Sequence, residues 1–133
     1  MTRKRWDGHS TEFGLWLREQ KEIDSGLGFV TTNLDYIWEN YKTGQWCFLE
    51  EKRYNSRPAP SQLKQFVRLH KLINDTKYLG FFVLVFENTT PEDGAMWLCQ
   101  LCSGITYQQI DKPTLMRFLT FFDIPPKLVP VTP

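Results

Sequence analysis

The sequence predicts an α/β domain in which helices flank a central mixed sheet. Three features indicate this class: helical apolar patterns in three segments, a probable β-hairpin between residues 33 and 52, and a continuously apolar run from Tyr78 to Phe86. Such a run is typical of a strand that is covered on both faces. The 133 residues, 41% of them hydrophobic, are enough for one compact core. We therefore predict a single domain over residues 1–124 and a Pro-rich tail over residues 125–133.

The N-terminal half is predicted to contain a helix followed by three strands. Ser10 can cap a helix that runs to about Ile23, with an inward stripe that includes Phe13 and Trp16. The segment Asp24-Ser25-Gly26 ends this helix. Three strands follow, over residues 27–31, 33–39 and 46–52, and a loop over residues 41–44 joins the last two into a hairpin.

The C-terminal half is predicted to alternate helices and strands. A stiff Pro-containing connector precedes Ser61, which can cap a helix through Ile73. This helix crosses over the sheet, so that the strand 78–86 pairs in parallel inside it. A loop over 89–94, a strand over 95–101 and a helix from Pro113 through Phe122 complete the order. The last helix is apolar almost all round, which a homodimer interface or tight burial within the domain would explain.

Two acids face each other across the predicted hairpin. If Asn40 pairs with Gln45, Asp35 lies directly opposite Glu50, with their Cβ atoms roughly 5 Å apart on one face. Glu51 faces the other side, because side chains alternate along a strand. Glu50 also continues the register of the apolar residues before it. An acid on such a covered face is costly unless it is paired or bound to a metal.

The two acids predict a site for a hard divalent cation. Like charges that face each other destabilise a hairpin unless something offsets them, and Mg²⁺ is held by one or two carboxylates together with water and substrate phosphate. Lys52 lies on the same face as Glu50 and can orient a water or stabilise charge on a scissile phosphate. These three residues therefore indicate a phosphodiesterase site. The alternative is a solvated hairpin face on which the acids are incidental and Lys52 only neutralises Glu50.

The pattern resembles the PD-(D/E)XK nuclease superfamily, which includes small Holliday-junction-resolvase-like and phage-type endonucleases. Asp35, Glu50 and Lys52 match the family's Asp and its acidic-x-Lys triplet on the strands of a hairpin. Several branches add a Glu on the first helix and a Gly-Phe that enters the first strand, here Glu12 and Gly28-Phe29. The Pro of the family motif is absent before Asp35. The order of all these motifs is a stronger signal than the triplet alone.

The resemblance implies a restriction-endonuclease-like αβββαβ core and a Mg²⁺-dependent deoxyribonuclease that hydrolyses phosphodiester bonds, with Mn²⁺ able to substitute. Asp35 and Glu50, joined by Glu12, would hold the metal, and Lys52 would lie near the attacking water. DNA is then the substrate, and the small size of the chain favours recognition of DNA structure over a specific sequence. The residues near the site that could contact DNA are Arg53, Arg57, Gln62, Lys64 and Gln65.

Two other classes of function stay open. A nuclease fold can lose activity and serve as a DNA-binding or protein-binding module, and the formal net charge of +1 permits this. A small interaction protein that docks a partner through its apolar last helix is the third possibility. The intact acidic pair and its lysine favour the enzyme.

The cysteines, histidines and apolar runs predict no other site. Cys99 and Cys102 form a Cys-x-x-Cys pair, but Cys47, His9 and His70 lack the spacing to complete a zinc site, so we expect buried free thiols. No apolar run approaches the length of a membrane span, and the basic N-terminus lacks the apolar stretch of a secretory signal. We therefore expect a cytoplasmic protein without membrane contacts.

Overall fold

The fold is known from a computed structural model that describes residues 12–23, 25–27, 34–101 and 106–124. The chain forms two compact units, residues 1–33 and residues 34–133. The described residues of the smaller unit form three short helices: α1 (Glu12–Glu19), η1 (Lys21–Ile23) and η2 (Ser25–Leu27), the last two of the 3₁₀ type. The predicted helix cap at Ser10 and the tail 125–133 lie outside the described residues.

Two predictions for the smaller unit need correction. Helix α1 ends at Glu19, before the predicted end at Ile23, because the amide of Gln20 turns back to the carbonyl of Leu17 in a tighter i→i−3 bond of 3.3 Å. Leu27, where we expected a strand to begin, belongs to η2, since the short Ser-Gly sequence before it closes a 3₁₀ turn. Residues 28–31 of that predicted strand lie outside the described residues.

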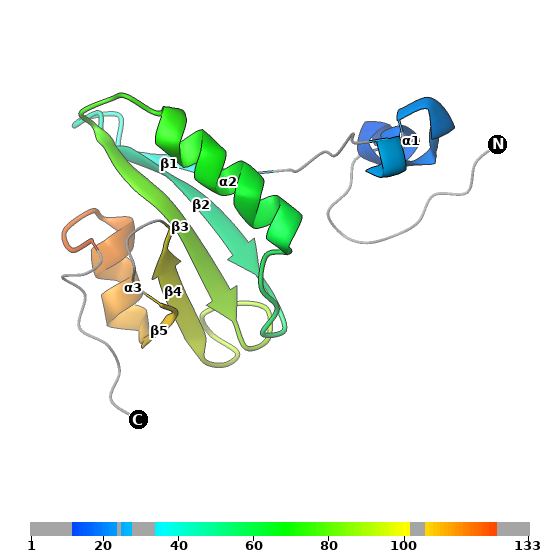
Figure 1. Ribbon diagram of the computed structural model, residues 1–133. Coiled ribbons are helices and arrows are strands. Elements are labelled where there is room, and N and C mark those ends of the chain that lie inside the picture. The colour runs from blue at the N-terminus through cyan, green and yellow to red at the C-terminus, as the bar shows by residue number, and fades with distance from the viewer. Residues whose placement is uncertain (1–11, 24, 28–33, 102–105, 125–133) are drawn as a thin grey trace. The chain divides into compact units, whose positions relative to one another are not determined.

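The larger unit is a five-stranded sheet with helix α2 on one face and helix α3 on the other (Figure 1). The strands, in chain and sheet order, are β1 (Tyr36–Glu39), β2 (Trp46–Lys52), β3 (Tyr78–Phe86), β4 (Met96–Gln100) and β5 (Gln108–Ile110). The helices are α2 (Pro60–Leu72), between β2 and β3 in the chain, and α3 (Lys112–Leu119), after β5.

The sheet is mixed, as predicted. β1 and β2 form the antiparallel hairpin. β2 pairs with β3 in parallel, because the connection through α2 returns the chain to the end of the sheet at which β2 began. β4 and β5 continue the sheet in antiparallel pairs. β4 occupies nearly the predicted range, whereas β5 was not predicted, because its three residues begin with two glutamines and carry no alternating pattern.

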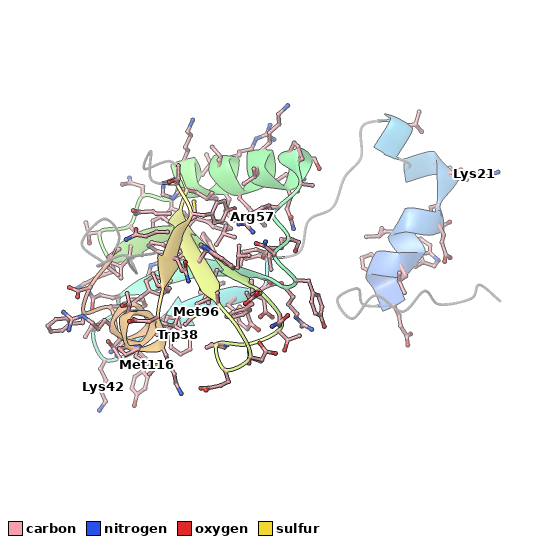
Figure 2. The ribbon with its side chains drawn as sticks, turned by 90° about the horizontal axis from the view of Figure 1, so that it is seen from below. Lys21, Trp38, Lys42, Arg57, Met96 and Met116 are labelled. Carbon is pink, nitrogen blue, oxygen red and sulfur yellow. The ribbon has the colours of Figure 1, made fainter. Side chains whose placement is uncertain are left out.

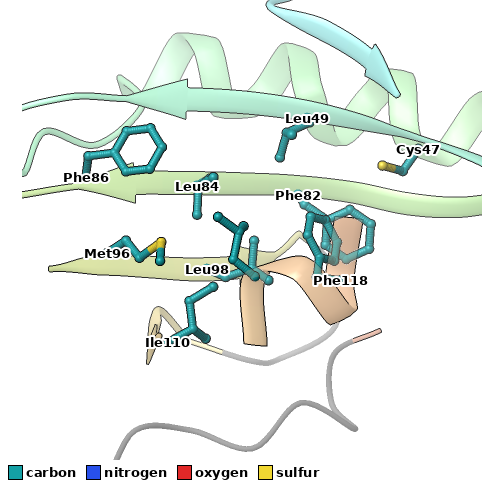
Figure 3. Packing of buried hydrophobic residues seen from close by; sticks show 10 residues of the cluster. Cys47, Leu49, Phe82, Leu84, Phe86, Met96, Leu98, Ile110 and Phe118 are labelled. Carbon is teal, nitrogen blue, oxygen red and sulfur yellow. The ribbon is translucent and has the colours of Figure 1, made fainter. Parts of the chain in front are cut away.

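The core lies on both faces of β3, which explains its continuously apolar sequence. On the α3 side, Phe82 meets Phe118 edge to face with ring centroids 4.8 Å apart, among the residues drawn in Figure 3. On the α2 side, Phe81 packs against Phe66 with centroids 4.5 Å apart. The two helices are therefore fixed to opposite faces of one strand by large buried aromatic rings.

The ends of the two long helices also differ from the prediction. α2 begins at Pro60 with Ala59 as its N-cap, so Ser61 does not cap it. Proline is pre-organised for the first helical position, and this preference places the start before the serine. α3 is capped by Asp111 and ends at Leu119, short of the predicted Phe122.

Helix α3 has one buried face, although its sequence is apolar almost all round. Leu115 and Phe118 are buried against the sheet, whereas Met116 and Phe122 are exposed. A homodimer through this exposed surface stays a prediction. No helix in the described part of the chain combines the length and the apolar character needed to cross a membrane.

Candidate functional site

The β1–β2 hairpin has the register that places the two predicted acids together. The amide of Asn40 donates to the carbonyl of Gln45 at 2.9 Å, and the pairing continues through β1 in the same register. Asp35, which directly precedes β1, therefore lies opposite Glu50 of β2. The site depends on this register, because a slip by one residue would place the two acids on opposite faces of the sheet.

Two hydrogen bonds tie Asp35 to β2. The amide of Asp35 donates to Oε1 of Glu50 at 3.1 Å, and the amide of Glu51 donates to Oδ2 of Asp35 at 2.9 Å. Each bond joins a backbone N–H of one strand to a carboxylate of the other, so the side chains replace the backbone pairing at the end of the hairpin. The relative position of the two carboxylates is thus fixed by the backbone.

Glu50 is the one buried charged side chain among the described residues, with 3% of its surface exposed. Burial, followed by the negative charge of Asp35, raises the pKa of Glu50 to about 7. The amide of Asp35 and the ammonium of Lys52 oppose this rise, because both favour the charged carboxylate. A positive charge beside Glu50 would favour its ionised form and lower this pKa.

Lys52 and Gln62 both approach the second oxygen of Glu50. Nζ of Lys52 lies 3.5 Å from Oε2, and Nε2 of Gln62 donates to the same oxygen at 3.3 Å. Lys52 shares the face of Glu50 because it is two residues further along β2, and Gln62 reaches it from the first turn of α2. The structure therefore brings together four of the residues singled out from the sequence: Asp35, Glu50, Lys52 and Gln62.

The oxygen atoms of this cluster fit a hard divalent cation. Each carboxylate oxygen has two lone pairs, so both groups can bind a cation while they keep the hydrogen bonds above. Mg²⁺ needs only one or two carboxylates, with water and phosphate oxygens for the rest. Within the described residues no group of three or more His, Cys, Asp or Glu side chains is placed to hold a metal ion, so water and phosphate would have to supply most of the ligands.

Two of the predicted basic or acidic residues lie away from this cluster. Arg53 points to the other face of the sheet, where its guanidinium lies 3.8 Å from Oε1 of Glu51, and Lys64 is exposed on α2. Glu12 begins α1 in the smaller unit, and its contribution to the metal stays a prediction. Gln65 is half-buried, and within the described residues its Oε1 has no hydrogen-bond partner.

Arg57 occupies a different position, on the α2 side of the sheet (Figure 2). Its guanidinium carbon lies 4.4 Å from the ring centre of Tyr107 and 5.9 Å from that of Trp97. The sequence did not point to these two aromatic residues. Trp97 lies in β4 and Tyr107 lies directly before β5. No local sequence pattern predicts a contact between parts of the chain that are so far apart.

The thiols and the described histidine play structural parts. Cys47 and Cys99 are buried, as predicted, and burial raises the pKa of Cys47 to about 12. Cys102 and His9 lie outside the described residues. Nδ1 of His70 lies 2.7 Å from the hydroxyl of Tyr78, which ties α2 to the beginning of β3.

Comparisons with family models, with curated proteins and with solved structures find no significant match to this chain.

Proposed function

We infer that this protein is a metal-dependent DNA endonuclease of the PD-(D/E)XK type. The observation that carries the inference is the buried Glu50, which faces Asp35 across a hairpin and has Lys52 beside it. Burial of an acid beside a second acid is unfavourable for folding, and one ion pair with a lysine need not repay that cost. An acid in this position is therefore better explained by a ligand than by stability, and the ligand that suits two carboxylates near an ammonium is a divalent cation with a phosphate group.

The arrangement of the elements supports the same family. Helix, antiparallel hairpin, crossover helix and parallel strand follow one another in the order of the restriction-endonuclease-like core. The acidic-x-Lys triplet lies near the end of β2, where β2 is paired in parallel with β3. Of the predicted first strand of that core, Leu27 belongs to η2 and residues 28–31 lie outside the described residues.

Each residue of the cluster has a chemical task in phosphodiester hydrolysis. Asp35 and Glu50 would hold Mg²⁺, or Mn²⁺ in its place, which when bound lowers the pKa of water and neutralises charge on the phosphate. Lys52 places a positive charge where negative charge develops on the phosphate. Gln62 donates to Oε2 of Glu50 and so keeps that carboxylate in one orientation.

The function is tested by cleavage of labelled linear, circular, single-stranded and four-way-junction DNA in the presence of Mg²⁺, Mn²⁺ or EDTA. We expect metal-dependent cutting by the wild type and its loss in both Glu50→Ala and Lys52→Ala. Glu51→Ala is the matched control, because it removes the neighbouring acid from the opposite face. The ranking of the substrates distinguishes recognition of DNA structure from recognition of ends.

Other outcomes would replace this proposal. Cutting that survives Glu50→Ala and Lys52→Ala would mean that the cluster is not the active site. A wild-type protein that binds DNA but cuts none of the substrates would be the catalytically inactive, DNA-binding module.

A further inference from the structure

The loop between β2 and α2 holds Arg57 in one fixed position. Nη1 of Arg57 donates to the carbonyl of Asn55 at 3.1 Å, to Oδ1 of Asn55 at 3.0 Å and to the carbonyl of Ser56 at 3.1 Å. The next residue, Pro58, is buried and anchors the loop. One edge of the guanidinium is therefore used to fasten the side chain to its own loop.

The backbone of this loop is strained next to Arg57 and is held in place by hydrogen bonds to β3 and the residues after it. Tyr54 and Asn55 are adjacent and have φ angles of 54° and 56°, in the left-handed region that side-chain-bearing residues rarely adopt. Their amides donate to the carbonyls of Asn88 at 2.9 Å and Phe86 at 2.8 Å, at the end of β3. Such strain persists only where surrounding contacts impose it, and it is concentrated at functional positions.

Two aromatic rings hold the flat face of the same guanidinium. Arg57 lies over Tyr107 and near Trp97, which gives it two cation–π contacts in place of a carboxylate partner. In the part of the chain that the structure describes, its Nε and Nη2 atoms donate to no acceptor, and no acid forms an ion pair with it. These N–H groups are thus available in the planar arrangement that binds a phosphate.

The position of this guanidinium relative to the catalytic cluster follows from the sheet register. Lys52 pairs with Val85, and Val85 pairs with Trp97, so the three residues form one row across β2, β3 and β4. Neighbouring strands lie about 4.8 Å apart, which places Trp97 roughly 10 Å from Lys52 on the α2 side. Arg57, held near Trp97, is therefore displaced sideways from the cluster and lies on the same side of the sheet.

We propose that Arg57, clamped between its own loop and the rings of Tyr107 and Trp97, binds a DNA phosphate that neighbours the one to be cleaved. The proposal rests on the nuclease function inferred above and names a contact that would position the substrate strand. A phosphate held at this displaced point fixes the direction in which the strand crosses Lys52. Arg57 would then be a positioning residue with no part in the chemical step.

The test measures binding of a labelled DNA duplex in EDTA, by fluorescence anisotropy, between about 50 and 200 mM salt. In Arg57→Ala, loss of one phosphate contact should weaken binding about tenfold. The plot of log affinity against log salt has a negative slope, and the magnitude of this slope should decrease by about 1. Arg68→Ala is the matched control, because Arg68 is an exposed arginine of α2 outside the proposed contacts, and it should keep the wild-type slope.

Three further variants keep the result interpretable if Arg57→Ala folds poorly. Arg57→Lys keeps the charge but loses the planar N–H groups, so it should keep the salt slope and still weaken binding. Tyr107→Phe keeps the ring beneath the guanidinium and should bind like the wild type, whereas Tyr107→Leu should bind as weakly as Arg57→Lys. Affinity and slope that are the same in Arg57→Ala and the wild type would overturn the proposal.

Cleavage assays in Mg²⁺ on the same variants separate this proposal from the proposed function. If cleavage depends on Glu50 but DNA binding is unchanged in Arg57→Ala, the phosphate contact is refuted and the nuclease function is retained. If the wild type does not cleave DNA, and the salt dependence of binding still changes in Arg57→Ala, the nuclease function is refuted and the phosphate site is retained. If the wild type neither cuts nor binds DNA, both are wrong.

Discussion

Glu50 and Glu51 are neighbours in β2 with the same side chain, yet they lie in opposite environments. Glu50 faces α2, where 3% of it is exposed and where an acid, an ammonium and an amide surround it. Glu51 faces the α3 side with 22% exposed, where it accepts a hydrogen bond from the hydroxyl of Tyr36 at 3.2 Å and forms an ion pair with Arg53.

The difference shows how a site can be distinguished from a surface pair. Exposed ion pairs such as Glu51–Arg53 contribute little to stability and need no functional explanation. The charge of Glu51 is felt locally, since it raises the pKa of Tyr36. Glu50, in contrast, is buried beside Asp35, another acid, and its burial costs free energy that the ion pair with Lys52 repays only in part.

The largest expected difference between the two acids is in DNA cleavage. Glu50→Ala removes a proposed metal ligand, and because loss of an outer-shell partner alone costs ten- to a hundredfold, we expect a loss of more than about a hundredfold. Glu51→Ala should change the rate by less than about fivefold, because Glu51 faces the other side of the sheet and pairs there with Arg53. Initial rates at saturating Mg²⁺ measure both, and equal losses would remove the distinction.

The second difference concerns stability as a function of pH. In the folded protein the pKa of Glu50 is about 7, whereas an ordinary Glu releases its proton near its usual pKa of 4.5. The folded state therefore binds more protons between these values, and the stability of the wild type falls as the pH rises through this window, by up to roughly 3 kcal/mol.

Glu50→Gln should abolish that fall, because the amide does not titrate, and Glu51→Gln should keep it. Denaturant unfolding at about pH 5 and about pH 8 compares the three proteins. Added Mg²⁺ should restore stability to the wild type mainly at the higher pH, since it binds the ionised carboxylate. If the stability of the wild type and that of Glu50→Gln change with pH in the same way, Glu50 is not a buried acid with a raised pKa.

A smaller effect is expected at Gln62, which touches the metal only through Glu50. Gln62→Leu keeps the size of the side chain but removes the N–H that donates to Oε2. Mg²⁺ binding should weaken by about tenfold, as for other residues that orient a ligand. Ser61→Ala, an exposed change in the same helical turn, is the control and should bind like the wild type. Unchanged Mg²⁺ affinity in Gln62→Leu would show that this hydrogen bond does not orient Glu50.

The smallest effect belongs to the opposite face of the sheet. Asp111 caps α3 by accepting a hydrogen bond from the amide of Thr114 at 2.9 Å. Asp111→Ala should cost about 1 kcal/mol of stability, and Asp111→Asn much less, because asparagine is an equally good cap. Neither should change Mg²⁺ affinity, since α3 lies on the other side of the sheet. A change in affinity would mean that the two faces are coupled.

The part of the site that the sequence could predict is the part built by local geometry. The Lys-Thr-Gly turn fixes the hairpin register, and strand alternation then decides that Glu50 faces the same way as Lys52 and that Glu51 does not. The continuously apolar β3 was equally predictable, because burial on both faces leaves no polar position.

The parts that could not be predicted depend on competing local preferences or on distant contacts. Pro60 displaced Ser61 from the N-cap, and the polar strand β5 forms because β4 offers it an edge. The stacking of Arg57 on Tyr107 joins residues far apart in the chain, for which the sequence has no periodic signal. Gln62 was a candidate from the sequence, but its hydrogen bond to Glu50 follows from the packing of α2, in which Phe66 is buried.

Calorimetric titration with Mg²⁺ tests most directly whether the buried acid is a cation ligand, with the wild type, Asp35→Asn, Glu50→Gln and Glu51→Gln measured side by side. The wild type and Glu51→Gln should bind Mg²⁺ with the same affinity, and binding should be lost in Asp35→Asn and Glu50→Gln. Equal binding by Glu50→Gln and the wild type, or no binding by the wild type, would contradict the assignment of this site.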